Sequence, residues 1–272
     1  MQIGPLVIPP DRLAVGLAAL VFLLAARLMA RRSPGLAGWA VNALLAGVVA
    51  ARVGFVARHA RIYAEDPLSA LAVWQGGFWP AAGAVGVLIV TLWHLRRVPD
   101  AIGPVVVVLV IGWIAHSVIA PFTRLGTAPP IPEISLAGLD GQGRRLAAGK
   151  PMVLNLWATW CPPCRREMPM MTELAAGSAD IAFVFANQGE SAGSVRRYLE
   201  AQGLPGADVF LDREQALMAR YGAMGLPTTL FLAADGTLVA AHMGEISRAA
   251  LIEGMERLRA QPLPPEAGSV RP

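Results

Sequence analysis

Two cysteines, Cys161 and Cys164, are the residues of this chain whose type and spacing most clearly predict chemistry. They are its only cysteines, and Pro162 and Pro163 separate them. Two thiols at this spacing can close a disulfide within one helical turn and can therefore cycle between dithiol and disulfide. We predict thiol–disulfide exchange at this motif. A permanent structural disulfide or a pair of inert thiols is the alternative.

The elements around the motif favour a reactive pair. Residues 152–158 form a short apolar run typical of a strand, and residues 163–176 are expected to form a helix. At a helix start, unpaired N–H groups and the positive end of the helix dipole favour a thiolate. We therefore expect Cys161 to be the exposed nucleophile and Cys164, one turn further on, to be the sheltered resolving thiol. One of the two prolines suits the first helical position, where no N–H is needed.

The segment Asn155-Leu-Trp-Ala-Thr-Trp-Cys-Pro-Pro-Cys-Arg-Arg-Glu-Met-Pro169 resembles the active-site segment of TlpA/ResA-type thioredoxin-fold reductases. The resemblance covers about residues 127–260. It implies a thioredoxin fold whose redox-active cysteine pair works without a cofactor or metal, with Trp160, Pro162 and Pro163 in supporting positions. Gly225-Leu-Pro-Thr228 matches the family loop in which a cis-proline faces the disulfide. The resemblance therefore assigns that supporting position to Pro227.

Two further positions concern proton handling. Asn155 stands where thioredoxins proper keep a buried aspartate that accepts protons, so that group is absent here. Glu167, three residues after Cys164, matches the acidic residue that TlpA/ResA-type proteins place near their thiols. Glu167 either tunes the pKa of a thiol or is an ordinary solvated glutamate of the helix surface. The sequence leaves both alternatives open.

Peroxide reduction and metal binding are weaker interpretations of the same segment. Peroxiredoxins share this fold and carry Thr or Ser three residues before their reactive cysteine, whereas this chain has Ala158 there and Thr159 only two residues ahead. A zinc site needs about four ligands, and no second Cys or His pair lies at ligand spacing. We expect no metal site.

The first 123 residues predict a membrane domain. The whole chain is 55% hydrophobic and only 15% charged, and its mean hydropathy is +0.50. Each of four apolar stretches approaches the ~20 residues that cross a bilayer as a helix. They are residues 13–30, 36–57 (interrupted by Asn42 and Arg52), 68–93 and 104–122. We predict about four transmembrane helices, rather than buried helices of a soluble core or a cleaved signal peptide in the first stretch.

The charge distribution predicts the topology. Residues 1–126 carry ten arginines against four acidic residues, whereas residues 127–262 carry twelve basic and fourteen acidic residues. Arginines at 31–32 and 96–97 favour cytoplasmic loops, which leaves both chain ends outside. We expect a multi-pass protein of the bacterial cytoplasmic membrane whose redox domain faces the periplasm. Nucleic-acid binding is not predicted, because the second half carries no basic cluster.

The membrane half resembles the N-terminal part of prolipoprotein diacylglyceryl transferase. The likeness rests on Ile3-Gly-Pro-Leu6, on Ala51-Arg-Val-Gly-Phe55, and on Pro67-Leu68 through Val73-Trp-Gln-Gly-Gly77. Where the transferase carries an essential histidine in a Met-Ser-Phe-His-Gly-Gly-type segment, this chain has Phe78-Trp-Pro-Ala-Ala-Gly83. We therefore expect a degenerate, transferase-like anchor that lies in the lipid bilayer. A lipid-modifying or lipid-binding protein with an accessory redox domain is the alternative.

The second half predicts an α/β domain, so the fold class is an α-helical membrane anchor plus an α/β thioredoxin fold. Prolines 129, 130 and 132 indicate a linker over residues 124–133, before a thioredoxin-like domain at 134–262 and a disordered tail at 263–272. The expected strands are 152–158, 181–186, 207–211, 228–232 and 237–242, and the helices are 163–176, 191–202, 214–221 and 248–258. Asp235-Gly236 predicts a hairpin turn between the last two strands.

The predicted function is a membrane-anchored periplasmic thiol–disulfide oxidoreductase that reduces protein disulfides, for example in cytochrome c maturation or thiol homeostasis. Net oxidation of thiols by the same chemistry is the alternative, because direction follows the reduction potential. The membrane half contains no cysteine. Electrons must therefore come from another protein, for which we expect a membrane thiol transporter of the DsbD/CcdA type.

Overall fold

The computed structural model describes residues 2–3, 6–7, 10–123, 134–146 and 149–261. The chain divides into two compact units, Met1–Arg124 and Leu125–Pro272. Each unit is described by itself below.

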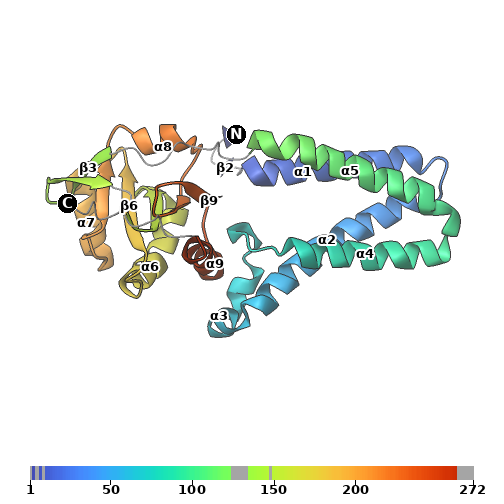
Figure 1. The fold of residues 1–272 in the computed structure, drawn as a ribbon, viewed down its shortest axis with the longest axis horizontal. Coiled ribbons are helices and arrows are strands. Elements are labelled where there is room, and N and C mark those ends of the chain that lie inside the picture. The colour runs from blue at the N-terminus through green and yellow to red at the C-terminus, as the bar shows by residue number, and fades with distance from the viewer. Residues whose placement is uncertain (1, 4–5, 8–9, 124–133, 147–148, 262–272) are drawn as a thin grey trace, which may run out of the picture. The chain divides into compact units, whose positions relative to one another are not determined.

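The N-terminal unit is helical apart from a pair of two-residue strands, β1 (Gln2–Ile3) and β2 (Leu6–Val7). Within it, α1 packs against α5 and α2 packs against α4 (Figure 1). The helices are α1 (Pro10–Met29), α2 (Leu36–Arg58), α3 (Ala60–Glu65), α4 (Pro80–Arg97) and α5 (Ile102–Thr123), with the short 3-10 turns η1 (Pro67–Leu71), η2 (Val73–Gln75) and η3 (Pro99–Ala101).

Close packing of α2 on α4 depends on glycine. A Cβ added at Gly86 would lie 2.6 Å from the carbonyl oxygen of Ala46, and one added at Gly83 would lie 3.0 Å from that of Gly47. Small residues of this kind let two helix backbones approach closely where few polar contacts are available.

Three helical segments within the described part of the chain are long and apolar enough to cross a membrane: Arg12–Met29, Leu36–Arg58 and Pro99–Pro121. The prediction of about four also counted residues 68–93. That stretch does not form one helix, because Pro67 and the positive-φ residues Gly76 and Gly77 break it into η1, η2 and a helix that begins only at Pro80. The resulting α4 has 18 residues and a basic last turn. In contrast, α2 runs unbroken through Asn42 and Arg52.

The C-terminal unit is built on a seven-stranded sheet of order β4-β3-β7-β6-β5-β8-β9. β5 pairs in parallel with β6, and β6 pairs in parallel with β7; the other pairings are antiparallel. The strands are β3 (Ile134–Gly138), β4 (Gly143–Leu146), β5 (Met152–Trp157), β6 (Ala182–Gln188), β7 (Val209–Asp212), β8 (Thr228–Leu232) and β9 (Leu238–Met243). The predicted hairpin turn is confirmed, with Gly236 at φ 84° between β8 and β9.

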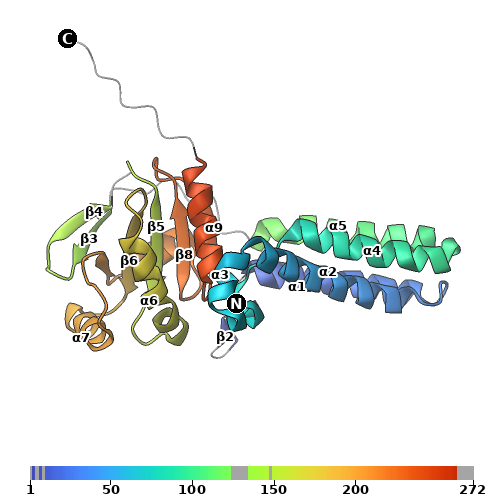
Figure 2. The same cartoon turned by 90° about the horizontal axis from the view of Figure 1, so that it is seen from below.

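Helices cover both faces of this sheet. α6 (Pro162–Ala176), α7 (Ala192–Gln202) and α9 (Arg248–Arg259) contribute to the core cluster on one face, and α8 (Ala216–Tyr221) contributes to the cluster on the other. Figure 2 shows α9 beside β8. The strand β5 is buried along its whole length, with alternate side chains entering the two clusters. The cysteine motif follows the end of this central strand.

Candidate redox site

The cysteine motif lies at the junction of β5 and α6. After β5 ends at Trp157, the backbone N–H of Cys161 donates to the carbonyl of Ala158 at 3.2 Å and turns the chain into the helix. Cys161 is the N-cap of α6, and its Sγ accepts a hydrogen bond from the N–H of Cys164 at 3.3 Å. Pro162 takes the first helical position, which is the arrangement predicted from the missing N–H of proline.

The two thiols are joined in the structure. The Sγ atoms of Cys161 and Cys164 form a disulfide of 2.08 Å. Cys164 is completely buried, and only 3% of the Cys161 surface is exposed. The expectation that Cys161 would be an exposed thiol is therefore wrong for this disulfide form. Both cysteines belong to the core cluster between the sheet and α6, while the side chain of Trp160 next to them is 66% exposed.

The loop before β8 lies against the same core. The Leu226–Pro227 peptide bond is cis, as the resemblance implied. Leu226 packs against the cluster that contains both cysteines. The loop is held on both sides, since the Thr228 hydroxyl donates to the carbonyl of Gly225 at 2.7 Å and Gly244 N–H donates to the carbonyl of Pro227 at 2.8 Å.

Glu167 is a buried carboxyl, so the solvated alternative is wrong. It lies one turn after Cys164 on the buried face of α6, and 3% of its surface is exposed. One carboxyl oxygen accepts from Asn155 Nδ2 at 2.9 Å, and the other accepts from the N–H of Ile246 at 3.0 Å. Burial raises the pKa of Glu167 to about 8, although the two hydrogen bonds act in the opposite direction and lower the pKa. The group therefore exchanges its proton in the pH range where thiols ionise.

Asn155 connects this carboxyl to the neighbouring strand. It lies opposite Thr229 in the β5–β8 ladder, and its Nδ2 also donates to Thr229 Oγ1 at 3.1 Å. Asn155 thus occupies the middle of a buried polar chain from β8 to Glu167. The sequence predicted the loss of the thioredoxin aspartate, and the structure puts a glutamate from α6 beside the residue that replaces it.

A charged pair stands next to Glu167. Arg166 donates from Nε to Glu245 Oε2 at 2.9 Å and also from Nη2 at 2.5 Å. The negative charge of Glu245 adds to the upward shift of the Glu167 pKa, and the positive charge of Arg166 opposes it. The proton affinity of Glu167 is therefore set by groups on both sides of it, on α6 and in the loop after β9.

Glu190 is a site residue that the sequence analysis missed. Its carboxylate stabilises the turn before Cys161, because Thr159 donates to the carboxylate from the backbone N–H at 2.7 Å and from the hydroxyl at 2.5 Å. Asn187 Nδ2 donates to the same carboxylate at 2.7 Å. The strand order could have indicated Glu190 as a site residue. Glu190 follows β6, the parallel neighbour of β5, and the loops after neighbouring parallel strands meet at one sheet edge.

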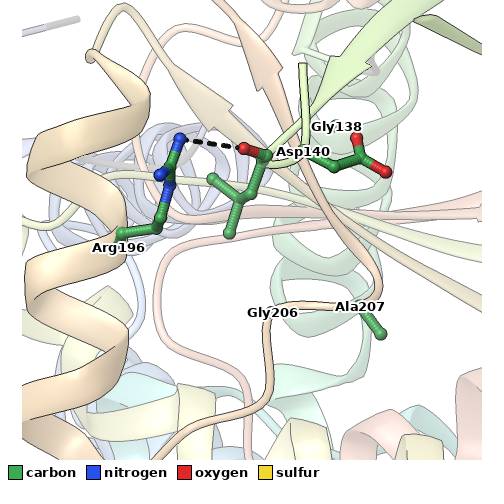
Figure 3. A pocket seen from close by; sticks show the side chains of 6 residues that line it. Gly138, Asp140, Arg196, Gly206 and Ala207 are labelled. Atoms are coloured by element: carbon green, nitrogen blue, oxygen red, sulfur yellow. Dashed lines mark hydrogen bonds between the residues drawn. The ribbon is translucent and has the colours of Figure 1, made fainter. Parts of the chain in front are cut away.

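A surface pocket lies away from the cysteine motif. Its volume is about 410 Å³. The lining residues are Gly138, Leu139, Asp140, Arg196, Gly206 and Ala207, and Arg196 donates across it to the carbonyl of Leu139 at 3.1 Å (Figure 3). None of them belongs to the motif, to the Pro227 loop or to the surroundings of Glu167. Within the described ranges, no group of three or more His, Cys, Asp or Glu side chains is arranged to hold a metal ion.

Comparison with known proteins finds a matching family model for each unit. The Redoxin family matches residues 127–254, and the prolipoprotein diacylglyceryl transferase family matches residues 1–126. The transferase match covers the membrane region in which the sequence carried the same resemblance.

Individual relatives match the redox unit. The thiol-disulfide oxidoreductase ResA of Geobacillus kaustophilus is 30% identical over 50% of this chain and 80% of its own length. The thioredoxin-like protein YneN of Bacillus subtilis is 35% identical over 43% of this chain and 71% of its own. A solved structure, a putative thiol:disulfide interchange protein DsbE from Chlorobium tepidum, is 26% identical and covers 50% of this chain and 99% of its own, with a TM-score of 0.44.

The residues and the relatives agree on the chemistry. A two-cysteine motif at a strand–helix junction, joined as a disulfide, occurs here in a chain that matches ResA over most of ResA's length. The chain belongs to the ResA-type thioredoxin-fold thiol-disulfide oxidoreductases, and the membrane region fused ahead of that domain is similar to prolipoprotein diacylglyceryl transferase.

Proposed function

We propose that this protein is anchored in the bacterial cytoplasmic membrane and reduces protein disulfides on the periplasmic side. The observation that carries the proposal is the Cys161–Cys164 disulfide at the start of α6, with the buried Glu167 one turn beyond it. This arrangement combines a nucleophile at a helix N-terminus with a proton-exchanging group close to the second thiol.

The exchange proceeds in two substitutions at sulfur. In the dithiol form, the Cys161 thiolate attacks one sulfur of a substrate disulfide, forms a mixed disulfide and expels the other substrate sulfur as a thiolate. Cys164 then loses its proton, attacks Cys161 Sγ and releases the second substrate sulfur. Two electrons pass from the cysteine pair to the substrate. The two substrate thiolates take up two protons, which replace the one that Cys164 loses and the one already lost by Cys161 to solvent.

The supporting residues act on these steps. Glu167, whose pKa is raised to about 8 by burial, accepts the proton of Cys164 and exchanges it with solvent. Trp160 is exposed next to the motif, and Leu226 of the Pro227 loop packs against the cluster that holds both cysteines. In the proposed function both give an extended substrate segment a surface to lie on. No cofactor beyond the cysteine pair enters the scheme.

The membrane region anchors the enzyme near its partners. An anchor confines the redox domain to the membrane surface, which raises its effective concentration toward membrane-bound partners. Residues 1–126 contain no cysteine, so reducing equivalents come from another protein, for which we propose a membrane thiol transporter of the DsbD/CcdA type. Oxidised apocytochrome c and other periplasmic protein disulfides are the proposed substrates.

A redox titration of Cys161–Cys164 tests the direction of transfer. The purified full-length protein is equilibrated with mixtures of reduced and oxidised dithiothreitol, and the free thiols are quantified. A potential well below about −200 mV supports reduction, because such a dithiol can reduce most protein disulfides. A potential near the roughly −120 mV of DsbA-type oxidants overturns the proposal and indicates net thiol oxidation.

The match of residues 1–126 to the transferase family favours one second candidate, a lipid-modifying or lipid-binding membrane protein with an accessory redox domain. Replacing Cys161 with Ser in cells separates the two. Loss of the phenotype of the intact gene supports the redox function. A phenotype that survives Cys161→Ser supports the lipid function.

A further inference from the structure

The segment between α2 and α4 is the most unusual part of the N-terminal unit. After α3 ends at Glu65, the chain forms η1 and η2 and regains a long helix only at Pro80. Irregular backbone of this kind leaves carbonyl groups without helical hydrogen bonds, and in a membrane each unsatisfied group costs several kcal/mol, on the order of a lost hydrogen bond in hydrocarbon. The structure therefore has to provide donors for them.

Arg52 is the main donor. It lies on α2, and 8% of its surface is exposed. Its Nε donates to the carbonyl of Ala70 at 2.9 Å, and its Nη2 donates to the carbonyl of Ser69 at 3.2 Å. Its Nη1 donates to the carbonyls of Gly76 at 2.7 Å and Gly77 at 2.9 Å. One guanidinium thus joins both ends of the irregular segment.

The surroundings of Arg52 are built for this role. The guanidinium carbon lies 5.6 Å from the centre of the Tyr63 ring and 5.9 Å from that of Phe78. Gly77 has φ +80°, and a Cβ there would lie 2.8 Å from Arg52 Nη1 and 2.6 Å from Phe55 Cε1. Because protein carbonyls and rings occupy the guanidinium, we assign Arg52 to holding the segment together rather than to binding an anion.

Turns within the segment satisfy further carbonyls. Ser69 N–H donates to Asp66, Gln75 N–H donates to Ala72, and Gly76 N–H donates to Val73. Together with Arg52, these bonds replace water for much of the backbone between α3 and α4.

The outer surface of the segment is apolar. Leu68 is 77% exposed and Leu71 is 72% exposed. Four more large apolar side chains of the segment are exposed: Val73, Trp74, Phe78 and Trp79. We call these six residues the apolar rim. Six exposed large apolar side chains within twelve residues call for an apolar partner.

The lipid bilayer fits this surface better than a second protein does. The segment is tied by Arg52 to α2, one of the segments apolar enough to cross a membrane. Trp and Phe are enriched where bilayer and water meet, and Arg58 lies 5.3 Å above the Trp79 ring, as expected for a cation near lipid headgroups. The charged Glu65 and Asp66 stand at one end of the segment, where they can remain in water.

We propose that residues 66–79 form a non-helical loop embedded in the interface of the lipid bilayer, with the apolar rim in contact with acyl chains and Arg52 in place of water at its backbone carbonyls. This inference rests on the membrane anchoring proposed above. Its consequence is that the anchor is held at a defined depth by a buried arginine as well as by its spanning helices.

Site-specific quenching tests the proposal. The chain becomes cysteine-free with Cys161→Ser and Cys164→Ser, and a single Leu71→Cys is then labelled with a polarity-sensitive fluorophore in phosphatidylcholine vesicles. We expect quenching by lipids carrying a spin label near the headgroup and protection from aqueous iodide. Quenching by iodide alone overturns the proposal, because the loop then faces water. Protection from both quenchers also overturns it, because a protein then covers the rim.

A label at a second position distinguishes a failure of the embedded-loop proposal from a failure of membrane anchoring. Val107 on α5 is exposed within the apolar segment Pro99–Pro121. A label at Val107→Cys that is not quenched by lipid contradicts membrane anchoring as a whole. A lipid-quenched Val107 label beside a water-exposed Leu71 label contradicts only the embedded loop.

The role of Arg52 is tested in the same vesicles. Arg52→Lys keeps the charge but cannot reach four carbonyls, so the Leu71 label should lose most of its lipid quenching and become accessible to iodide. Gly77→Ala, which crowds the same guanidinium, should act in the same direction. Arg27→Lys, at an exposed arginine of α1 outside the proposed loop, is the matched control and should leave the quenching unchanged. Unchanged quenching in both Arg52→Lys and Gly77→Ala overturns the role of Arg52.

Discussion

At the scale of single residues, the disulfide and the carboxyl of Glu167 share the buried face of one helix. Cys161, the proposed nucleophile, stands at the N-cap of α6, with Cys164 one turn later and Glu167 one turn after that. In this order Glu167, the proposed proton acceptor, is one turn from Cys164 and two turns from Cys161 along the helix. Each thiol therefore has a separate, testable role.

Replacing Cys164 with Ser should trap the reaction half-way. The variant keeps the nucleophile Cys161 but cannot break the mixed disulfide, so covalent adducts with substrate proteins should accumulate. Non-reducing electrophoresis of membranes from cells that express the variant detects them, and reductant should remove them. The matched variant Cys161→Ser should form few adducts. Equal adduct formation by both variants would reverse the assignment of the two thiols.

Glu167 should make stability depend on pH. Its pKa is about 8 in the folded protein and 4.5 when unperturbed, so the folded state binds the extra proton between these values. The free energy of unfolding should therefore fall as pH rises from about 4.5 to about 8, and level off above. At about 1.4 kcal/mol for each pKa unit, the loss is of the order of a few kcal/mol.

Chemical denaturation of the oxidised protein at several pH values measures this slope. Glu167→Gln should flatten it, because the amide does not titrate. Glu200→Gln, at an exposed position of α7, is the control and should keep the wild-type slope. A wild-type free energy of unfolding that stays level or rises between pH 5 and 8 would contradict the raised pKa.

At the scale of elements, the turn between β5 and α6 is held from the neighbouring strand. Glu190, in the loop after β6, receives the Thr159 N–H and hydroxyl. The position of Cys161 thus depends on a residue of a different strand–helix unit. This contact is an element-level feature, because neither segment provides it alone.

Removing the Glu190 carboxylate should loosen this turn. Hydrogen bonds to a charged group contribute about 1.5–3 kcal/mol, so Glu190→Ala should lower the free energy of unfolding by about 2 kcal/mol. In the reduced protein it should also change the rate at which Cys161 is alkylated. Glu190→Gln can still bond Thr159 and should recover part of both effects. A double-mutant cycle with Thr159→Val should show coupling, and additive effects would argue against the contact.

Packing of α9 on β8 depends on one glycine. A Cβ at Gly254 would overlap the ring of Phe231. Although Ala is the better helix former by about 1 kcal/mol, Gly254→Ala should destabilise the protein by about 1–3 kcal/mol through overpacking. Gly177→Ala is the control, because its added Cβ would meet nothing closer than 3.7 Å. Thermal unfolding compares the two, and a stabilised Gly254→Ala would show that the helix can shift.

At the scale of the whole molecule, a redox unit follows a membrane unit in one chain. The two units have separate hydrophobic cores and match separate families. In the proposed function, the membrane unit holds the redox unit in the compartment that contains its partners. Topology is therefore the property of the whole chain that matters for function.

Cysteine labelling in spheroplasts tests this topology. In the cysteine-free chain, a membrane-impermeant maleimide should label Gln261→Cys, near the end of the redox unit, and should not label Arg32→Cys in the turn between α1 and α2. Detergent should make both sites reactive. Labelling of Arg32→Cys alone in intact spheroplasts would place the redox unit in the cytoplasm and contradict the proposed localisation.

Some features escaped the sequence for identifiable physical reasons. The hairpin of β3 and β4 was not predicted, because Gly143-Arg-Arg-Leu146 carries no apolar alternation and becomes a strand only by pairing. Residues 68–79 look like continuous apolar membrane sequence, and their break at Gly76 and Gly77 is supported by donors that Arg52 supplies from another helix. In both cases a long-range contact overrides a local pattern.

The sequence by itself determined the reaction class and the two-part organisation. The Cys161-Pro-Pro-Cys164 spacing, a strand before it and a helix after it are local properties, and so are long apolar runs. Tertiary structure decided the surroundings of the thiols. The burial of Cys161, the raised pKa of Glu167 and the hydrogen bonds from Thr159 to Glu190 depend on groups 12 to 79 residues apart along the chain. Desolvation and hydrogen-bond geometry come from the folded chain, and they act on residue types that the sequence had already provided.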